Sequence, residues 1–469
     1  MSQEQNKIIE VKDKKGLWIK TFGCQMNEYD SEKVLALLSD GYRPVETPEE
    51  ATVAFINTCS VRDKAEHKLY SLLGRLRDLK NDNPDLVIGV GGCVAQQEGK
   101  AIISRSPTVD FVVGTHNLSL VPSLIKQAQE TKTRGVAVNY REEWEELSPQ
   151  IDEYTKDVLE FGASFRALVS IQRGCSKHCS FCVVPTTRGE QVSRDPAEIL
   201  REIKLKVNLG AKEVLLLGQT VNSFGLDLSP RYKFEKLIRD IAEIPGVKRI
   251  RFSSPHPQEV KPEFIELYGD VAQLCPHIHL PLQSGSDRIL KLMNRNYRRG
   301  RYLEIVESLR ARMPGISITT DVIVGFPTET EQDFEDSLDI MRQVSYSGSF
   351  SFMYSRRPNT KAITFDKSDE IENSVAHERL LRLQELQDQI CTKENAKWLG
   401  KTVEVLAEGS VRNLPSAKRG RIPENTLVEI LEGEAKPGDL VKIKVDYTSS
   451  RGLKGTIVED KWLSMKEKR

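Results

Sequence analysis

The segment Cys175-Ser-Lys-His-Cys179-Ser-Phe-Cys182 places three thiols on one short loop, directly after a predicted strand at residues 166–171. Thiolate sulfur is the soft ligand of iron–sulfur clusters, and cysteines separated by three and two residues can bind three irons of a cubane. The fourth iron then has no protein ligand, so a small molecule with an amino and a carboxylate group can chelate it. We therefore predict an iron–sulfur site with one open iron.

A tetrahedral zinc site is the alternative interpretation of this loop, because its three cysteines and His178 have suitable ligand types and number. The sequence that follows favours the iron–sulfur interpretation, since it continues as six strand-then-helix units. Six units predict a partial β/α barrel, with ligand sites at the carboxyl ends of the strands. The predicted strands are residues 166–171, 213–217, 249–253, 277–282, 317–324 and 349–354.

The first ~120 residues predict a parallel sheet covered by helices, the pattern of a Rossmann-like α/β domain. Predicted strands are residues 17–22, 52–57, 85–90 and 111–113, and predicted helices are residues 31–38, 63–79 and 96–104. Cys24, Cys59 and Cys93 each come just after one of the first three strands. Parallel strands end at the same edge of a sheet, so we expect these three thiols to meet there. Scattered cysteines can also be small buried apolar residues, which is the alternative for this set.

After a long predicted helix at residues 374–399, the chain changes to short alternating strands at residues 403–406, 426–431, 440–445 and 455–458. This pattern predicts a small β-barrel. The acidic, aperiodic stretch at residues 136–162 suits a linker.

Composition limits the class of protein. Lys and Arg (68) balance Asp and Glu (68), so any contact with nucleic acid must come from local patches. The sequence has no apolar run long enough for a membrane span and no signal segment, which predicts a soluble, cytoplasmic protein without a membrane partner. Eight cysteines in such a chain favour reduced thiols that act as ligands.

Four stretches carry a closer resemblance: residues 21–31 (TFGCQMNEYDS), 57–62 (NTCSVR), 91–93 (GGC) and 173–190 (RGCSKHCSFCVVPTTRGE). They resemble the radical S-adenosylmethionine methylthiotransferases over nearly the whole chain. The resemblance implies that Cys24, Cys59 and Cys93 hold an auxiliary [4Fe–4S] cluster. It also implies that Cys175, Cys179 and Cys182 are the catalytic set, holding the [4Fe–4S] cluster that cleaves S-adenosylmethionine.

The same resemblance implies a domain organisation. Residues 1–135 would form the methylthiotransferase domain with the auxiliary cluster, and residues 136–160 a linker. Residues 161–399 would form the radical S-adenosylmethionine core, and residues 400–469 an RNA-binding TRAM domain.

The implied reaction is methylthiolation of an adenosine in tRNA, using two S-adenosylmethionine molecules and a sulfur atom held on the auxiliary cluster. Residues 23–27 (GCQMN) resemble the branch that acts at C2 of N6-dimethylallyladenosine beside the anticodon. The alternatives are the branches acting on threonylcarbamoyladenosine in tRNA or on a ribosomal protein aspartate, and a non-enzymatic zinc protein that binds RNA. Expected partners are the tRNA anticodon stem-loop and a flavodoxin-like or ferredoxin-like electron donor, with the enzyme acting as a monomer.

Further residues follow from the resemblance and from position. Residues expected at the S-adenosylmethionine site are Phe181, Gln219, Ser253, Gln283, Asp321 and Gly325. A tight turn at residues 325–327 is the alternative for the last of these. Residues expected to contact RNA are Arg188, Arg298, Arg356 and Arg421. For the basic run at residues 298–301, a solvated helix start is the alternative.

Overall fold

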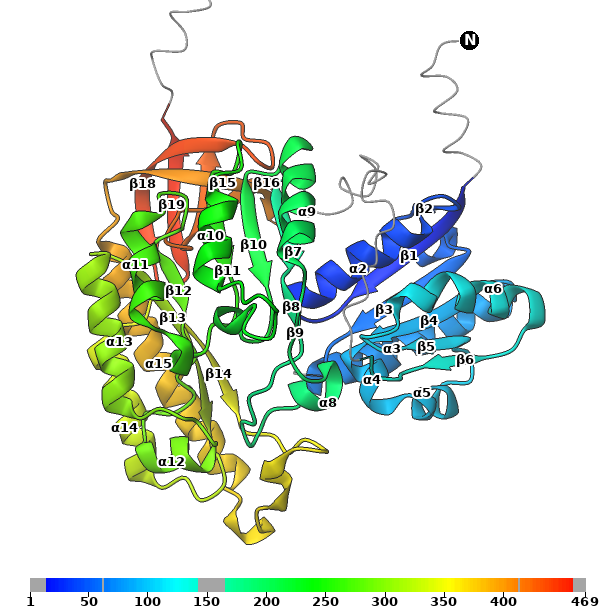
Figure 1. Ribbon diagram of the computed structural model, residues 1–469, viewed down its shortest axis with the longest axis horizontal. Helices are drawn as coiled ribbons and strands as arrows, with labels where there is room; N and C mark the ends of the chain where they lie inside the picture. The colour runs from blue at the N-terminus through cyan, green and yellow to red at the C-terminus, as the bar shows by residue number, and fades with distance from the viewer. Residues whose placement is uncertain (1–13, 61–62, 142–164, 412–413, 459–469) are drawn as a thin grey trace, which may run out of the picture.

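The computed structural model describes residues 14–60, 63–141, 165–411 and 414–458. Figure 1 shows three units: an N-terminal unit (blue to cyan), a central one (green to orange) and a small terminal barrel (red). The predicted linker falls mostly at residues 142–160, which lie outside the described residues. The predicted domain boundaries stay a prediction.

The N-terminal unit contains a six-stranded parallel sheet in the order β2-β1-β3-β4-β5-β6. Its strands are β1 (Lys15–Thr21), β2 (Tyr42–Pro44), β3 (Val53–Thr58), β4 (Val87–Gly92), β5 (Phe111–Val113) and β6 (Gly135–Ala137). The four predicted strands are confirmed. The two edge strands β2 and β6 were not predicted, since each has only three residues and shows no alternation.

The helices of this unit are α2 (Gln25–Leu38), α3 (Asp63–Asp82), α4 (Cys93–Glu98), α5 (Lys100–Arg105) and α6 (Val121–Thr131). Helix α2 begins at Gln25, whereas the sequence predicted a start at residue 31. The first turn was missed because Met26 and Tyr29 pack against Leu215 and Leu217 of the central unit instead of their own sheet.

The central unit contains the six predicted parallel strands. They are β7 (Arg166–Ser170), β10 (Glu213–Leu217), β11 (Arg249–Phe252), β12 (His277–His279), β13 (Ser317–Val324) and β14 (Gly348–Met353). A parallel bridge from Ile250 to Leu274 joins the two halves of this partial barrel. Strand β12 ends three residues earlier than predicted.

Helices cover the outer face of the partial barrel, and one large apolar core fills the space between the two layers. The helices of the central unit are α8 (Val184–Arg188), α9 (Pro196–Asn208), α10 (Phe234–Ala242), α11 (Pro262–Asp270), α12 (Asp287–Leu292), α13 (Arg299–Arg312), α14 (Glu331–Val344) and α15 (Asn373–Ala396). The short helix α8 is not part of this outer layer and lies beside the N-terminal unit. Helix α9 has a well-formed start: the Asp195 carboxylate accepts a hydrogen bond from the Ala197 N–H at 2.8 Å, and Pro196 is the first helical residue. No helix in the described ranges is both long and apolar enough to cross a membrane.

The terminal unit is a closed five-stranded barrel, in the order β15-β16-β17-β19-β18. Its strands are β15 (Thr402–Val411), β16 (Leu414–Arg421), β17 (Leu427–Glu432), β18 (Leu440–Ser449) and β19 (Gly452–Ile457). Strand β16 was not predicted, since its sequence LPSAKRGR lacks apolar alternation. This barrel sits at the amino ends of the central strands, where Arg249 binds the Arg421 carbonyl at 2.8 Å. It therefore covers the end opposite the cysteine loop.

A buried cluster of charges joins the N-terminal and central units. Lys33 of α2 contacts Glu202 of α9 at 3.3 Å, and Lys206 of α9 contacts Glu32 of α2 at 2.5 Å. Arg194 also pairs with Glu202, and the side chains of both are fully buried. Helix α2 starts directly after Cys24, so this junction fixes the Cys24 region relative to the central unit.

Lys206 also contacts Glu202, at 3.1 Å. Replacing Glu202 by Gln is expected to lower the free energy of unfolding by about 3–5 kcal/mol, because the buried cations Lys33, Arg194 and Lys206 lose their shared carboxylate. Urea unfolding measures this change. Glu198→Gln, on the same helix, is the control: its ion pair with Arg201 is partly exposed, so a change within about 1 kcal/mol is expected. Equal effects of the two substitutions would show that the junction adds no stability.

Candidate active site

The first cysteine set gathers at one edge of the N-terminal sheet, as predicted. Cys24 precedes α2, Cys59 follows β3, and Cys93 is the first residue of α4, directly after β4. The thiols of Cys24 and Cys93 both form hydrogen bonds with the Cys59 thiol. The structure therefore brings the three sulfurs together.

Two buried asparagines fix the start of α2 against the end of β3. The Asn27 amide donates to Asn57 Oδ1 at 2.9 Å, and the Asn57 amide donates to the Asn27 carbonyl at 2.8 Å. Gly23 lies so close to this point, at a φ of +143°, that an added Cβ would meet Cys59 Cβ at 2.6 Å. A glycine is required there for Cys24 to approach Cys59.

Arg188, at the end of α8, brings a positive charge to this set. Its guanidinium pairs with Asp30 of α2 at 2.9 Å, and both side chains are buried. The hydrogen bond with Cys59, together with the charge of Arg188, lowers the pKa of Cys24 to about 6 and that of Cys93 to about 7, against the opposing effect of burial. Two of the three thiols therefore ionise near neutral pH, as metal ligands must.

The second cysteine set lies past the end of β7 and receives hydrogen bonds at each sulfur. The Lys177 N–H donates to Cys175 Sγ at 3.4 Å, and the Val184 N–H donates to Cys182 Sγ at 3.5 Å. Arg295 Nη1 donates to Cys179 Sγ at 3.3 Å. Hydrogen bonds to the ligand sulfurs are a regular feature of iron–sulfur sites, so these residues fit such a cluster.

The geometry does not favour the zinc alternative. Within the ranges that the structure describes, no group of three or more His, Cys, Asp or Glu side chains is arranged to hold a single metal ion. A cubane is bound through three different irons, so its thiolates need not converge on one point.

Helix α8 connects the two cysteine sets. It begins two residues after Cys182, ends at Arg188 and contacts α4, which begins with Cys93. The five residues of α8 span only about 7.5 Å at 1.5 Å per residue. In Figure 1, α8 lies between the central unit and the edge of the N-terminal sheet. Both sets therefore face the same junction.

The structure places several predicted S-adenosylmethionine contacts near the carboxyl ends of the central strands. Gln219 and Ser253 follow β10 and β11, and Gln219 Oε1 is buried without a hydrogen-bond partner. Gln283 has a φ of +74° and donates its N–H to the Asp321 carbonyl at 2.8 Å. Phe181 packs against an apolar cluster with Met293 and Phe326, so its ring supports the cysteine loop.

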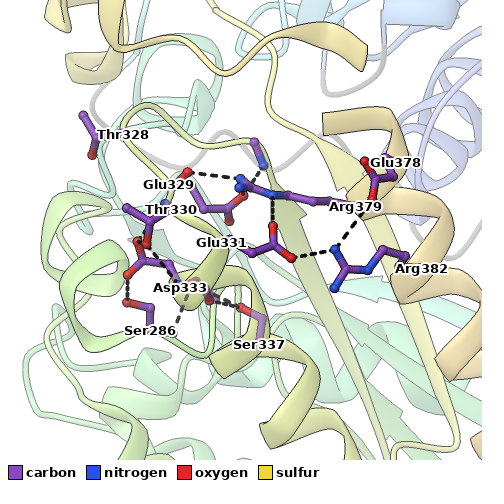
Figure 2. Close-up of polar contacts among 12 residues, drawn as sticks. Ser286, Thr328, Glu329, Thr330, Glu331, Asp333, Ser337, Glu378, Arg379 and Arg382 are labelled. Atoms are coloured by element: carbon purple, nitrogen blue, oxygen red, sulfur yellow. Dashed lines mark hydrogen bonds and ion pairs between the residues drawn. The ribbon is translucent and has the colours of Figure 1, made fainter. Parts of the chain in front are cut away.

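Gly325 lies in a tight turn, the alternative considered above. Its N–H donates to the buried Glu329 carboxylate at 2.7 Å, and Glu329 pairs with Arg379 of α15 at 2.9 Å. Figure 2 shows Arg379 reaching from α15 to both Glu329 and Glu331. The turn is thus fastened to α15 at the end of β13.

Replacing Gly325 by alanine is expected to lower the free energy of unfolding by roughly 2–5 kcal/mol. Its φ is +72°, and a Cβ would lie 2.7 Å from Ala376 Cβ, so backbone strain and overpacking add. Gly315→Ala is the matched control, because Gly315 has a φ of +84° with nothing within 4 Å. Thermal or urea unfolding should therefore show the smaller loss for Gly315→Ala, and the reverse order would contradict this account of the turn.

The four arginines predicted to contact RNA lie in different parts of the structure. Arg188 is buried at the first cysteine set, and Arg421 pairs with Glu408 at the junction of the terminal and central units. Arg356 donates to the carbonyls of residues 363 and 365. Arg298 is exposed at the start of α13, and its Nη1 donates to the carbonyls of Arg295 and Tyr297 at 3.1 and 2.9 Å. RNA contact by these four residues stays a prediction.

Sequence reasoning missed the roles of Asp30 and Arg295. Asp30 lies within the quoted segment 21–31, and its signal was present only as part of that pattern. Arg295 lies just before the basic run at residues 298–301, and its spacing from the cysteine loop gives no sign that it reaches Cys179.

Comparisons with known proteins agree with this geometry. Residues 16–114 match the model of Uncharacterized protein family UPF0004, and residues 169–341 match that of the Radical SAM superfamily. The chain is 42% identical to tRNA-2-methylthio-N(6)-dimethylallyladenosine synthase of Geobacter sulfurreducens, over 96% of this chain and 99% of that protein. The identity with the protein of the same name from Geobacter metallireducens is 44%, over 94% and 98% of the two chains. With that of Moorella thermoacetica it is 42%, over 96% and 100%.

Solved structures show the same fold. The radical S-adenosylmethionine methyltransferase TsrM from Kitasatospora setae superposes with a TM-score of 0.54 at 13% identity, over 74% of each chain. The cobalamin-dependent S-adenosylmethionine radical enzyme OxsB gives a TM-score of 0.52 at 13% identity, over 77% of this chain and 55% of that one. At near full-length coverage and above 40% identity to the three relatives, the chain belongs to the radical S-adenosylmethionine family of tRNA-2-methylthio-N6-dimethylallyladenosine synthases.

Proposed function

We propose that this protein attaches a methylthio group to C2 of N6-dimethylallyladenosine in tRNA. The full-length relatives carry this activity in their names, and the two cysteine sets supply the ligands that it needs. The observation that carries the proposal is the short helix α8, which ends at Arg188 beside one set and starts next to the other. A substrate held between them would have access to both.

In this proposal Cys24, Cys59 and Cys93 bind the auxiliary [4Fe–4S] cluster, and Cys175, Cys179 and Cys182 bind the second. When bound, the second cluster supplies the electron that cleaves S-adenosylmethionine, and the auxiliary cluster supplies a sulfur atom for transfer.

Residues around the second cysteine set hold its sulfurs in place, shield the loop and offer a contact to a bound ligand. The Thr220 hydroxyl lies 3.2 Å from Cys175 Sγ, and the backbone N–H groups of Lys177 and Val184 hold two sulfurs in place. Phe181 and its apolar neighbours keep water away from one side of the loop. The buried Gln219 Oε1 has a free acceptor position for a bound ligand.

The test is nucleoside mass spectrometry of tRNA from a bacterium that lacks its own methylthiotransferase and expresses this chain. Methylthiolated N6-dimethylallyladenosine is the expected product. Methylthiolated threonylcarbamoyladenosine, or a modified ribosomal protein aspartate, would show that the enzyme acts on a different substrate from the one proposed. Colourless protein with two or fewer metal ions would instead support the zinc-binding alternative.

The finer expectations stay predictions. They are recognition of the anticodon stem-loop, electron transfer from a flavodoxin-like or ferredoxin-like protein, a monomeric state and a cytoplasmic location.

A further inference from the structure

Arg295 is a buried cation beside the second cysteine set. It lies between α12 and α13 with a relative exposure of 6%. Its Nη1 donates to Cys179 Sγ at 3.3 Å, its Nη2 to the Pro281 carbonyl at 3.2 Å, and its Nε to the Tyr297 hydroxyl oxygen at 3.1 Å. Each of the three guanidinium nitrogens therefore donates a hydrogen bond within the protein.

Arg295 differs from five other buried arginines in what balances its charge. Those five pair with a carboxylate: Arg188, Arg194, Arg249, Arg251 and Arg379. Within the described ranges, the partners of Arg295 are a carbonyl, a phenol and the sulfur of Cys179, with no carboxylate among them. A buried charge without a counter-charge costs several kcal/mol. Of these three partners, Cys179 is the one that the cysteine spacing assigns to a cluster, so the guanidinium lies directly against a proposed ligand sulfur.

The guanidinium is held rigidly in this position. The Tyr297 hydroxyl donates to the Leu282 carbonyl at 2.7 Å, and Tyr297 is itself 4% exposed. The backbone N–H of Arg295 donates to the Leu290 carbonyl at 2.9 Å. A cation fixed in this way keeps its distance from Cys179 Sγ when the charge at the sulfur changes. Its electrostatic effect on a bound cluster therefore needs no rearrangement of the protein.

We propose that Arg295 is a positioning residue that raises the reduction potential of the cluster bound by Cys175, Cys179 and Cys182. Adding one electron makes the cluster more negative, and a fixed positive charge at a ligand sulfur stabilises the reduced form over the oxidised form. Hydrogen bonds to the sulfurs and the net charge are recognised determinants of cluster potential. This inference rests on the proposed function, since it requires a cluster at this loop.

The test uses full-length protein in which Cys24, Cys59 and Cys93 are replaced by alanine, so that a single cluster remains. Into this parent we would introduce Arg295→Gln, which removes the charge, and Arg295→Lys, which keeps it. Arg301→Gln is the matched control, because Arg301 is exposed and its side chain contacts Glu304. Iron content and a redox titration monitored by electron paramagnetic resonance are measured for each protein.

Arg295→Gln is expected to keep about four irons and to shift the ratio of reduced to oxidised cluster at least tenfold toward the oxidised form, or about 59 mV for one electron. Arg295→Lys should show a smaller shift in the same direction, and Arg301→Gln none. If the Gln variant loses iron, Arg295→Met, which also removes the charge, provides the measurement. An unchanged potential in whichever of these two charge-removing variants retains its iron overturns the role of Arg295.

The experiment distinguishes a failure of the proposed function from a failure of the inference about Arg295. If the parent binds no cluster, the proposed function itself is wrong. If the parent binds a cluster and cleaves S-adenosylmethionine, but the potential is the same with and without Arg295, only the inference about Arg295 is wrong.

Discussion

Replacing Cys59 by alanine is expected to stop methylthio transfer to tRNA while the release of 5′-deoxyadenosine stays measurable. Cys59 is the central member of the first set, with hydrogen bonds to both Cys24 and Cys93, so its loss leaves two ligands for the auxiliary cluster. The other set lies on a different loop past β7 and keeps all its ligands. Iron content should fall from about eight to about four per chain.

The matched control for Cys59→Ala is Cys391→Ala. Cys391 is also a buried free thiol, but it lies on α15 and contacts Gln387 and the Ser347 carbonyl. Chromatography measures 5′-deoxyadenosine, and mass spectrometry of tRNA nucleosides measures the product. Full yield of methylthiolated product from Cys59→Ala would show that methylthio transfer does not require Cys59.

Replacing Cys179 by alanine is expected to abolish both 5′-deoxyadenosine release and methylthio transfer. Cys179 is one of the three proposed ligands on its loop and the one that Arg295 contacts, so its replacement would remove a ligand and leave the buried guanidinium without its sulfur partner. Because the auxiliary set is unchanged, about four irons should remain.

Comparison with Cys59→Ala separates a specific effect from general damage. Both variants lose half of the iron, yet only Cys179→Ala should lose S-adenosylmethionine cleavage. Measurable 5′-deoxyadenosine from Cys179→Ala, at a rate near that of the unsubstituted enzyme, would assign cleavage to the other set.

The sequence predicts those parts of the fold whose side chains face their own unit. The six central strands carry apolar residues that alternate with polar ones or form short apolar runs, as in EVLLL of β10, so their pattern is recognisable in the sequence. The start of α2 was misplaced because Met26 and Tyr29 pack against the neighbouring unit. Strand β16 was missed because barrel closure, and not side-chain alternation, defines it.

For the site, the sequence predicts which cysteines gather but not which charges surround them. Strand ends and loop spacing are local features, so both cysteine sets could be expected from them. The roles of Arg188 and Arg295 depend on contacts with residues far away in the chain, at Asp30 and Cys179. The sequence around a single arginine does not indicate its distant partner, so neither contact could be expected. The predicted RNA contacts of Arg188 and Arg421 stay predictions.

A crystal structure of the anaerobically reconstituted enzyme, with the iron atoms located from their anomalous scattering, tests the central claim most directly. We expect two iron sites per chain, one bound by Cys24, Cys59 and Cys93 and the other by Cys175, Cys179 and Cys182. Their ligand-free corners should face each other beside α8, close enough for one nucleotide to reach both. Iron at only one site, or two clusters opening away from each other, would contradict the account.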